Sequence, residues 1–247
     1  MSLNATELLI MAMLPLVAFL YAAVGHGGAS GYLALMALFS VPTVVMKPSA
    51  LLLNLFVAGI AAWHYCRNGY FKWNLFIGFA IGSIPAAFVG GMLTLDPIWY
   101  KRILGAFLLF AVLKMLNLIG KSSKSTIQDA VLWQSIVVGS VIGFLSGLIG
   151  IGGGIILSPI ILLLHWGSMK QTAAVSAVFI WVNSAAGLSG QIIAGVDFHS
   201  QILYWVLLAL IGGFLGSYYG SRHMNNVHLK RLLALVLVMA SFKLLSL

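Results

Sequence analysis

Apolar residues fill most of this chain in long runs that short polar stretches separate. Most runs match the roughly 17–25 residues that a helix needs to cross a bilayer. The pattern therefore predicts an all-α polytopic membrane protein with about 8–10 apolar helical segments. The runs lie near residues 8–24, 29–46, 48–66, 73–94, 101–119, 130–149, 154–166, 172–194, 201–221 and 229–247.

The composition excludes a soluble domain. The 247 residues are 62% hydrophobic and 7% charged, and the mean hydropathy is +1.08. A soluble fold of this size would lack the polar surface that water requires. The net charge of +9 comes from 13 Lys and Arg residues at the edges of the apolar runs. Basic residues in such places anchor a protein at lipid headgroups, and no basic soluble face favours nucleic-acid binding.

The start of the chain and its single cysteine add two expectations. Glu7 precedes the first run without any Lys or Arg, so residues 8–24 are expected to belong to the mature fold and not to a cleaved signal peptide. Cys66 is the one cysteine of the sequence, which rules out an internal disulfide.

Two homologous halves are predicted from matching residues. Lys101-Arg102 is echoed by Lys230-Arg231 at a spacing of 129 residues. The other matches are Leu104 with Leu233, Leu108 with Leu237, Lys114 with Lys243, Gly82 with Gly212, and Gly90 with Gly220. We therefore expect a first transmembrane repeat over 1–120, a polar linker over 121–126 and a second repeat over 127–247, which together form one integral membrane domain. Ser125 with Gln128 predicts a capping box at the next helix start.

Each half contains a glycine-rich break, at Gly25-His26-Gly27-Gly28 and at Gly150-Ile151-Gly152-Gly153-Gly154. A break cannot face lipid, because its freed N–H and C=O groups would have no partner there. Breaks in corresponding positions of two repeats indicate a transport site. We expect half-helices around each break, forming a re-entrant hairpin, while three other segments per half cross fully. An odd number of crossings makes the halves an inverted repeat, although single kinked spans are the alternative.

The basic residues favour the inverted arrangement. With odd crossings, one side carries Arg67, Lys72, Lys114, Lys121, Lys124, Lys170, Arg222, Lys230 and Arg231. The other side carries only Lys47, Lys101, Arg102 and Lys243. The richer side is expected to be cytoplasmic, which places both termini outside.

The distribution of acidic residues favours an anionic or neutral substrate. Glu7, Asp96, Asp129 and Asp197 all fall near segment ends, whereas cation transporters usually bury a carboxylate. Main-chain N–H groups at half-helix N-termini can hold an anion, because the helix dipole is positive there. The predicted substrate-binding residues are Gly25, His26, Gly27, Gly28, Ser30, Asn54, Gly150, Gly152, Gly153, Gly154, Ser176 and Asn183.

These residues also have structural interpretations that the sequence leaves open. The glycines could serve helix packing, and Ser30, Asn54, Ser176 and Asn183 could hydrogen-bond between helices. His26 could bind an anion, take a proton during coupling, or stay neutral beside a carbonyl. No His, Cys or acidic group has metal-ligand spacing, so neither a metal nor another cofactor is expected.

One enzymatic alternative comes from Gly28-Ala29-Ser30-Gly31, which fits the short pattern of rhomboid-type intramembrane serine proteases. Ser30 would be the nucleophile, with a histidine of another helix as its base. The pattern leaves the repeat unexplained, and the expectation is that the protein is not an enzyme.

Over nearly its whole length, the chain resembles the TauE/SafE family of sulfite-exporter-like membrane proteins. The resemblance rests on paired halves that each open with a G-x-G-G break, on Ser158-Pro159, and on Asn54 and Ser176. It implies a secondary transporter of a small sulfur-containing anion (sulfite, thiosulfate or an organosulfonate) in the inner membrane. An anion channel of the same architecture is the alternative. A proton is the expected coupling ion, with membrane lipids and a homo-oligomer as further expected partners.

Overall fold

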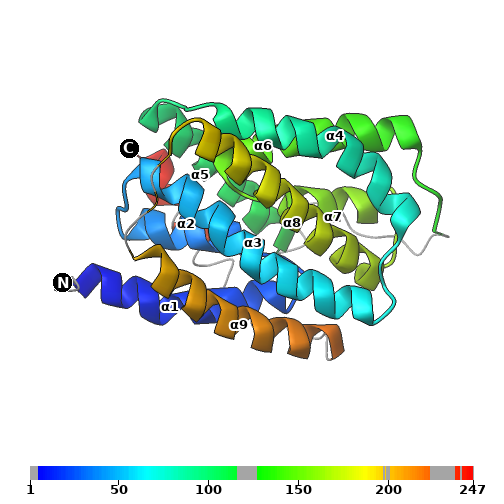
Figure 1. Ribbon diagram of the computed structural model, residues 1–247, viewed down its shortest axis with the longest axis horizontal. Helices are drawn as coiled ribbons and strands as arrows, with labels where there is room; N and C mark the ends of the chain where they lie inside the picture. The colour runs from blue at the N-terminus through cyan, green and yellow to red at the C-terminus, as the bar shows by residue number, and fades with distance from the viewer. Residues whose placement is uncertain are drawn as a thin grey trace.

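The computed structural model describes residues 5–115, 127–196, 198, 201–222, 237–239 and 241–246. This part of the chain is helical without any strand, which confirms the all-α prediction (Figure 1). The helices are α1 (Ala5–Ala22), α2 (Ala29–Leu38), α3 (Thr43–Arg67), α4 (Trp73–Met92), α5 (Pro97–Met115), α6 (Leu132–Ile149), α7 (Gly154–Leu163), α8 (Met169–Ile193) and α9 (Ile202–Arg222). Residues 237–239 and 241–245 add helical turns.

Five of the described helices are long and apolar enough to cross a membrane: α3, α4, α6, α8 and α9. Their outer faces are apolar, and Leu203, Ile211 and Leu215 on α9 are more than half exposed. A contiguous apolar exterior of this kind is typical of a surface that contacts lipid. Trp73 and Trp133 lie exposed at the starts of α4 and α6, where the sequence predicts headgroup anchors.

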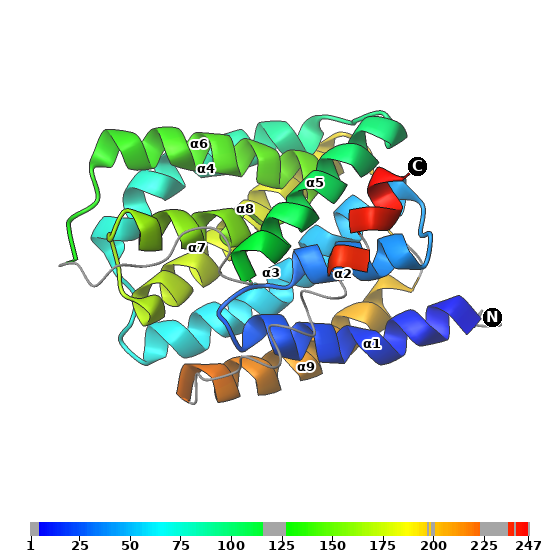
Figure 2. The same cartoon turned by 180° about the vertical axis from the view of Figure 1, so that it is seen from behind.

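The helices stop at both glycine breaks, as the sequence predicts. The helix before the second break is not the half-helix expected there, because α6 is long enough to cross a membrane. The half-helices α2 and α7 contain 10 residues each. Each follows a glycine in the left-handed region, with φ of 101° at Gly28 and 76° at Gly153. Such φ values suit glycine because it carries no Cβ. In Figures 1 and 2, α1 with α2 and α6 with α7 each double back, and the two pairs enter from opposite ends of the long axis.

The two half-helices also end alike. Ser40 after α2 has φ of 57°, and His165 after α7 has φ of 55°. In both cases the next residue donates a hydrogen bond of 2.9 Å back to a carbonyl oxygen of the helix. Val41 N–H donates to Met36 O, and Trp166 N–H donates to Ile161 O. This is the hydrogen-bond pattern of a helix that ends on a left-handed residue. The repeat seen in the sequence therefore extends to backbone geometry.

Two sequence-based boundaries are wrong. The run 29–46 was expected to be one segment with a boundary before Pro48, but α2 ends at Leu38 and Pro48 lies inside α3. The helix ends early because residues 39–42 form the turn just described. Gln128 does not start a helix either, since its N–H donates to His165 O at 2.8 Å and α6 begins only at Leu132. The capping box that the structure contains is instead made by Ser168 and Gln171 at the start of α8.

Helices of one half pack against helices of the other half in a reciprocal way. Helix α4 packs on α6 and α8, while α9 packs on α1 and α3. The matched glycines make these contacts. Gly82 and Gly90 of α4 lie against the Ile136 and Phe144 carbonyl oxygens of α6.

On the opposite side of the molecule, Gly212 and Gly220 of α9 lie against the Pro15 and Ala23 carbonyl oxygens of α1. These four glycines therefore allow close packing between helices. Division of the chain at 121–126 and the inverted arrangement in the membrane stay predictions, and residues 116–126 lie outside the described residues.

The core surrounds the half-helices. Every residue of α2 from Ala29 to Ala37 is buried, so this half-helix is enclosed by protein instead of facing lipid. One apolar cluster includes Leu14, Tyr32 and Trp205, and a second includes Phe79 and Phe179. The two breaks meet between α3 and α8, because a Cβ on Gly27 or on Gly152 would contact both Asn54 of α3 and Ile180 of α8.

Candidate functional site

Asn54 lies at the point where the two breaks meet. It is the twelfth residue of α3 and is fully buried. Its Oδ1 accepts a hydrogen bond of 2.9 Å from the N–H of Ala29, the first residue of α2. This N–H belongs to the first turn of a helix, which offers it no partner of its own. Asn54 therefore fixes the N-terminus of the half-helix.

The other end of the Asn54 amide has no hydrogen bond. Nδ2 is buried without a partner, while Gly152 of the second break lies directly against it. A Cβ on Gly27 would come within 2.5 Å of Oδ1. The amide thus lies between one glycine from each half, with an unused donor.

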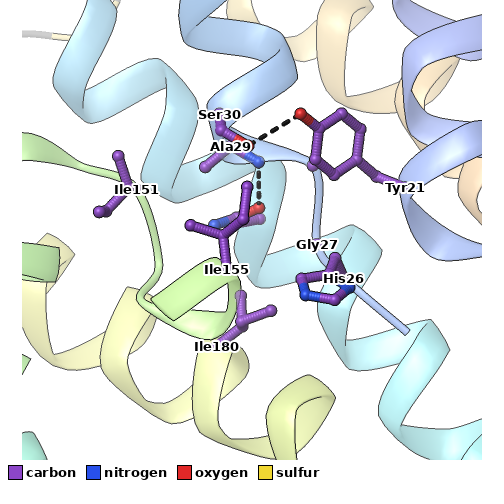
Figure 3. A pocket seen from close by; sticks show the side chains of 10 residues that line it. Tyr21, His26, Gly27, Ala29, Ser30, Ile151, Ile155 and Ile180 are labelled. Atoms are coloured by element: carbon purple, nitrogen blue, oxygen red, sulfur yellow. Dashed lines mark hydrogen bonds between the residues drawn. The ribbon is translucent and has the colours of Figure 1, made fainter. Parts of the chain in front are cut away.

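A small pocket of about 180 Å³ opens at this point (Figure 3). Much of this volume is open to the outside, and the part that a water-sized molecule can occupy is about 10 Å³. Its lining residues are Tyr21, His26, Gly27, Gly28, Ala29, Ser30, Asn54, Ile151, Ile155 and Ile180. In this conformation the pocket has room for about one water molecule, so an anion of several heavy atoms requires the walls to move apart.

The pocket lining follows the internal repeat. His26 and Ile151 both follow the first glycine of their break, and Ser30 and Ile155 are both the second residue of their half-helix. Ile180 is the twelfth residue of α8, as Asn54 is of α3. Three polar side chains from the first half therefore face their three isoleucine counterparts from the second half. The pocket lies where the halves meet and has one polar and one apolar wall.

Ser30 is held by a tyrosine. Its hydroxyl donates to the Tyr21 hydroxyl at 2.9 Å, which links α2 to α1 (Figure 3). The protease alternative needs a histidine in that place, so this geometry does not favour it. A Cβ on Gly28 would come within 2.7 Å of the Tyr32 hydroxyl, which is itself buried without a partner.

His26 connects the first break to the second half of the chain. Its Nδ1 lies 3.1 Å from the Val24 carbonyl oxygen, and its Nε2 lies 3.1 Å from Ser158 Oγ on α7. Ser158 Oγ is in turn 2.8 Å from Ser176 Oγ on α8. Ser176 is thereby tied to the site without lining the pocket.

The predicted site residues divide into two groups. His26, Gly27, Gly28, Ser30 and Asn54 line the pocket. Gly152 and Gly154 flank it, since Gly152 lies against Asn54 and a Cβ on Gly154 would lie 3.6 Å from His26 Cδ2.

The remaining predicted residues lie elsewhere. Gly25 packs on Ala173, Gly150 on the Lys47 backbone, and Gly153 on Ile142 and Phe179. Asn183 donates to Ser83 Oγ at 3.0 Å and to Phe179 O at 2.8 Å, at the contact between α8 and α4.

Sequence reasoning missed Tyr21, Ser158 and the three isoleucines as part of the site. The isoleucines could have been found by carrying the repeat through residue by residue. Tyr21 and Ser158 carry no such signal, because their partners depend on how the hairpins fold back.

Charged side chains are missing from the pocket lining, and the described residues contain no group of three or more His, Cys, Asp or Glu that could hold a metal ion. Lys47 of α3 instead contacts the C-terminus of α4. Its Nζ donates to the Gly91 and Leu93 carbonyl oxygens there. The pocket therefore offers neutral donors and the N-terminus of α2.

Comparison with known proteins gives a consistent result. The family model described as Sulfite exporter TauE/SafE matches residues 9–244. A probable membrane transporter protein of Sinorhizobium fredii is 36% identical over 232 residues, covering 93% of this chain and 94% of the relative. A probable membrane transporter protein of Methanocaldococcus jannaschii is 28% identical over 141 residues, covering 56% and 52%. No solved structure matches.

Proposed function

Because this chain belongs to the sulfite exporter TauE/SafE family of membrane transporters, we propose that it is a secondary transporter of a small sulfur-containing anion. Sulfite, thiosulfate and organosulfonates are the candidate substrates. The proposed location is the inner membrane, with both termini outside and the side rich in basic residues in the cytoplasm. A gradient of protons supplies the driving force.

The observation that carries this proposal is the unpaired Asn54 Nδ2 between the two breaks. A buried donor without an acceptor costs about 1–3 kcal/mol. An oxyanion in the pocket would accept from this N–H and remove the penalty. The Asn54 oxygen is already engaged by Ala29, so the amide cannot turn over without losing that bond.

Two further features favour an anion over a cation. Among the described residues that line the pocket, none has a carboxylate that could neutralise a cation. The N-terminus of α2 lies at the pocket, where the positive end of the helix dipole favours negative charge. Neutral donors bind an anion less tightly than charged donors do. The anion can therefore also be released, as transport by a carrier requires.

The isoleucine wall narrows the substrate class. Ile151, Ile155 and Ile180 offer no hydrogen bonds to the side of the ligand that faces them. An anion with one weakly hydrated end fits such a wall better than an anion with oxygens on all sides. Thiosulfate has a terminal sulfur and a sulfonate has a carbon group, whereas sulfate has neither. We therefore expect thiosulfate or a small sulfonate to be preferred over sulfate.

Buried polar atoms on α8 support a route that leads away from the pocket. Ser184 Oγ and both amide atoms of Gln191 are buried without hydrogen-bond partners. Ser176, Ser184 and Gln191 are spaced so that they fall on one face of the helix. Rocking of one half against the other would open this face to water and give alternating access.

Flux of labelled thiosulfate into proteoliposomes tests the proposal. We expect saturable uptake that is stimulated by unlabelled thiosulfate inside the vesicles and competed weakly by sulfate. Linear, unsaturated flux without counter-transport would instead identify the anion channel. Absence of flux for thiosulfate, sulfite and a small sulfonate, compared with empty liposomes, would refute the proposed function.

A further inference from the structure

A chain of hydrogen bonds runs from the first break into the second half of the protein. It connects the Val24 carbonyl, His26, Ser158 and Ser176 over distances of 3.1, 3.1 and 2.8 Å. Ser158 is 8% exposed and Ser176 is fully buried. Neither serine lines the pocket, so substrate contact alone does not explain their arrangement.

The direction of each bond follows from chemistry. A carbonyl oxygen can only accept, so His26 Nδ1 carries a hydrogen and donates to Val24 O. In neutral His26, Nε2 is then an acceptor, and Ser158 donates its hydroxyl proton to it. Ser158 has no second proton, so Ser176 donates to Ser158. The neutral ring is held in one tautomer, with the lone pair of Nε2 accepting from the Ser158 hydroxyl.

The same three groups can accommodate the protonated ring. A proton taken from water binds at Nε2, which becomes a donor to Ser158, while Nδ1 keeps its bond to Val24 O. Ser158 then donates its own proton to Ser176, and Ser176 donates to another acceptor. A serine in a helix commonly donates to the carbonyl oxygen four residues earlier, which for Ser176 is that of Thr172. The Thr172 hydroxyl is buried without a partner.

We propose that His26, poised by Ser158 and Ser176, is the proton-binding site that couples the movement of the anion to a proton gradient. The inference rests on the proposed transport function. His26 lines the pocket, so its protonation puts a positive charge beside the bound anion. The anion and the proton each strengthen binding of the other by the same factor. Proton and anion therefore cross together, as a symport.

Two tyrosines lie near His26 or the first break. Tyr21 of α1 is the other titratable side chain of the pocket lining. Tyr65 of α3 donates to Ala23 O beside the break. From α7 the Ser158 hydroxyl reaches His26, and Ser176 of α8 contacts Ser158 in turn. A proton is thus expected to reside on the imidazole.

The test measures thiosulfate uptake into proteoliposomes with an imposed pH difference and the membrane potential clamped. Thiosulfate is chosen because it does not titrate near neutral pH, unlike sulfite. Acid outside is expected to accelerate uptake severalfold in the wild type. His26→Gln keeps a hydrogen-bonding side chain, and whatever thiosulfate uptake it retains should no longer respond to the pH difference. Saturable wild-type uptake without any response to the pH difference would overturn the coupling site and leave the proposed function standing.

The serines are tested by the pH profile. Ser158→Ala should shift the midpoint of the pH dependence of the uptake that remains, and Ser158→Thr should restore the midpoint. Ser189→Ala is the matched control, because Ser189 is exposed on α8 and donates to its own helix at Ala185 O. An unshifted midpoint in Ser158→Ala would contradict the positioning role.

Proton uptake on binding gives a second measurement that needs no pH gradient. Thiosulfate binding to the detergent-solubilised protein is titrated calorimetrically at a pH where His26 is neutral, in two buffers with different ionisation enthalpies. About one proton per bound anion is expected for the wild type, and none for His26→Gln. Equal proton uptake in both proteins would overturn the inference even if the variant transports poorly.

Discussion

Replacing Gly152 with alanine should disturb the site through one neighbouring side chain. Gly152 has φ of 73°, and a Cβ there would overlap Asn54 Nδ2. Because Ile180 Cγ2 would lie 2.9 Å from the same Cβ, the methyl group cannot move away from the amide. Asn54 must therefore shift, and its bond to the N–H of Ala29 lengthens or breaks.

The size of the effect has two parts. Left-handed backbone costs alanine about 1–2 kcal/mol relative to glycine. Loss of the Asn54 contact at the start of α2 adds about 0.5–2 kcal/mol, the usual range for a removed N-cap acceptor. Only the second part, the lost Asn54 contact, affects the affinity of the pocket for the anion. At about 0.5–2 kcal/mol it corresponds to a roughly 2- to 30-fold weaker affinity for the anion.

Gly195→Ala separates the two parts. Gly195 has φ of 79°, and a Cβ added there would have nothing within 4 Å, so this variant carries the backbone strain alone. Thermal unfolding and the KM for thiosulfate should be measured for both variants. Both should lose stability, but only Gly152→Ala should raise KM. The same KM in both variants would refute the placement of Asn54 in the site.

Two further variants test single hydrogen bonds. Tyr21→Phe removes the acceptor of the Ser30 hydroxyl. It should raise the KM for thiosulfate roughly fivefold, equivalent to about 1 kcal/mol. The control Tyr204→Phe, on the exposed face of α9, should leave this KM unchanged. Lys243→Met removes the cation whose Nζ donates to Leu38 O, at 2.7 Å, and so caps the C-terminus of α2. In a chemical denaturation series the free energy of unfolding should fall by up to about 1 kcal/mol. An unchanged free energy of unfolding would contradict this capping role.

Much of the fold could be predicted because it depends on local chemistry. Clusters of glycine in apolar sequence cannot continue a helix facing lipid, so the ends of α1 and α6 were predictable. The end of α2 was not, because Ser40 carries no turn signature and its left-handed φ is stabilised by the following bonds to the helix.

The site was predictable only in part, because its two walls meet through tertiary packing. Asn54 and His26 stood out as polar residues in apolar surroundings. Asn183 has the same appearance in sequence, yet it bonds to Ser83 at a helix contact. Whether Asn183 faces a pocket or a helix contact depends on how α8 packs against α4. No local sequence pattern encodes this packing.

The most direct test of the anion site is thiosulfate counterflow by Asn54→Asp. Aspartate has nearly the shape of asparagine, and its Oδ1 can still accept from the N–H of Ala29. The unpaired donor is replaced by an oxygen with negative charge, which repels an anion in the pocket. We expect counterflow to fall by roughly two orders of magnitude or more, equivalent to about 3 kcal/mol. Wild-type counterflow in this variant would show that the anion binds elsewhere.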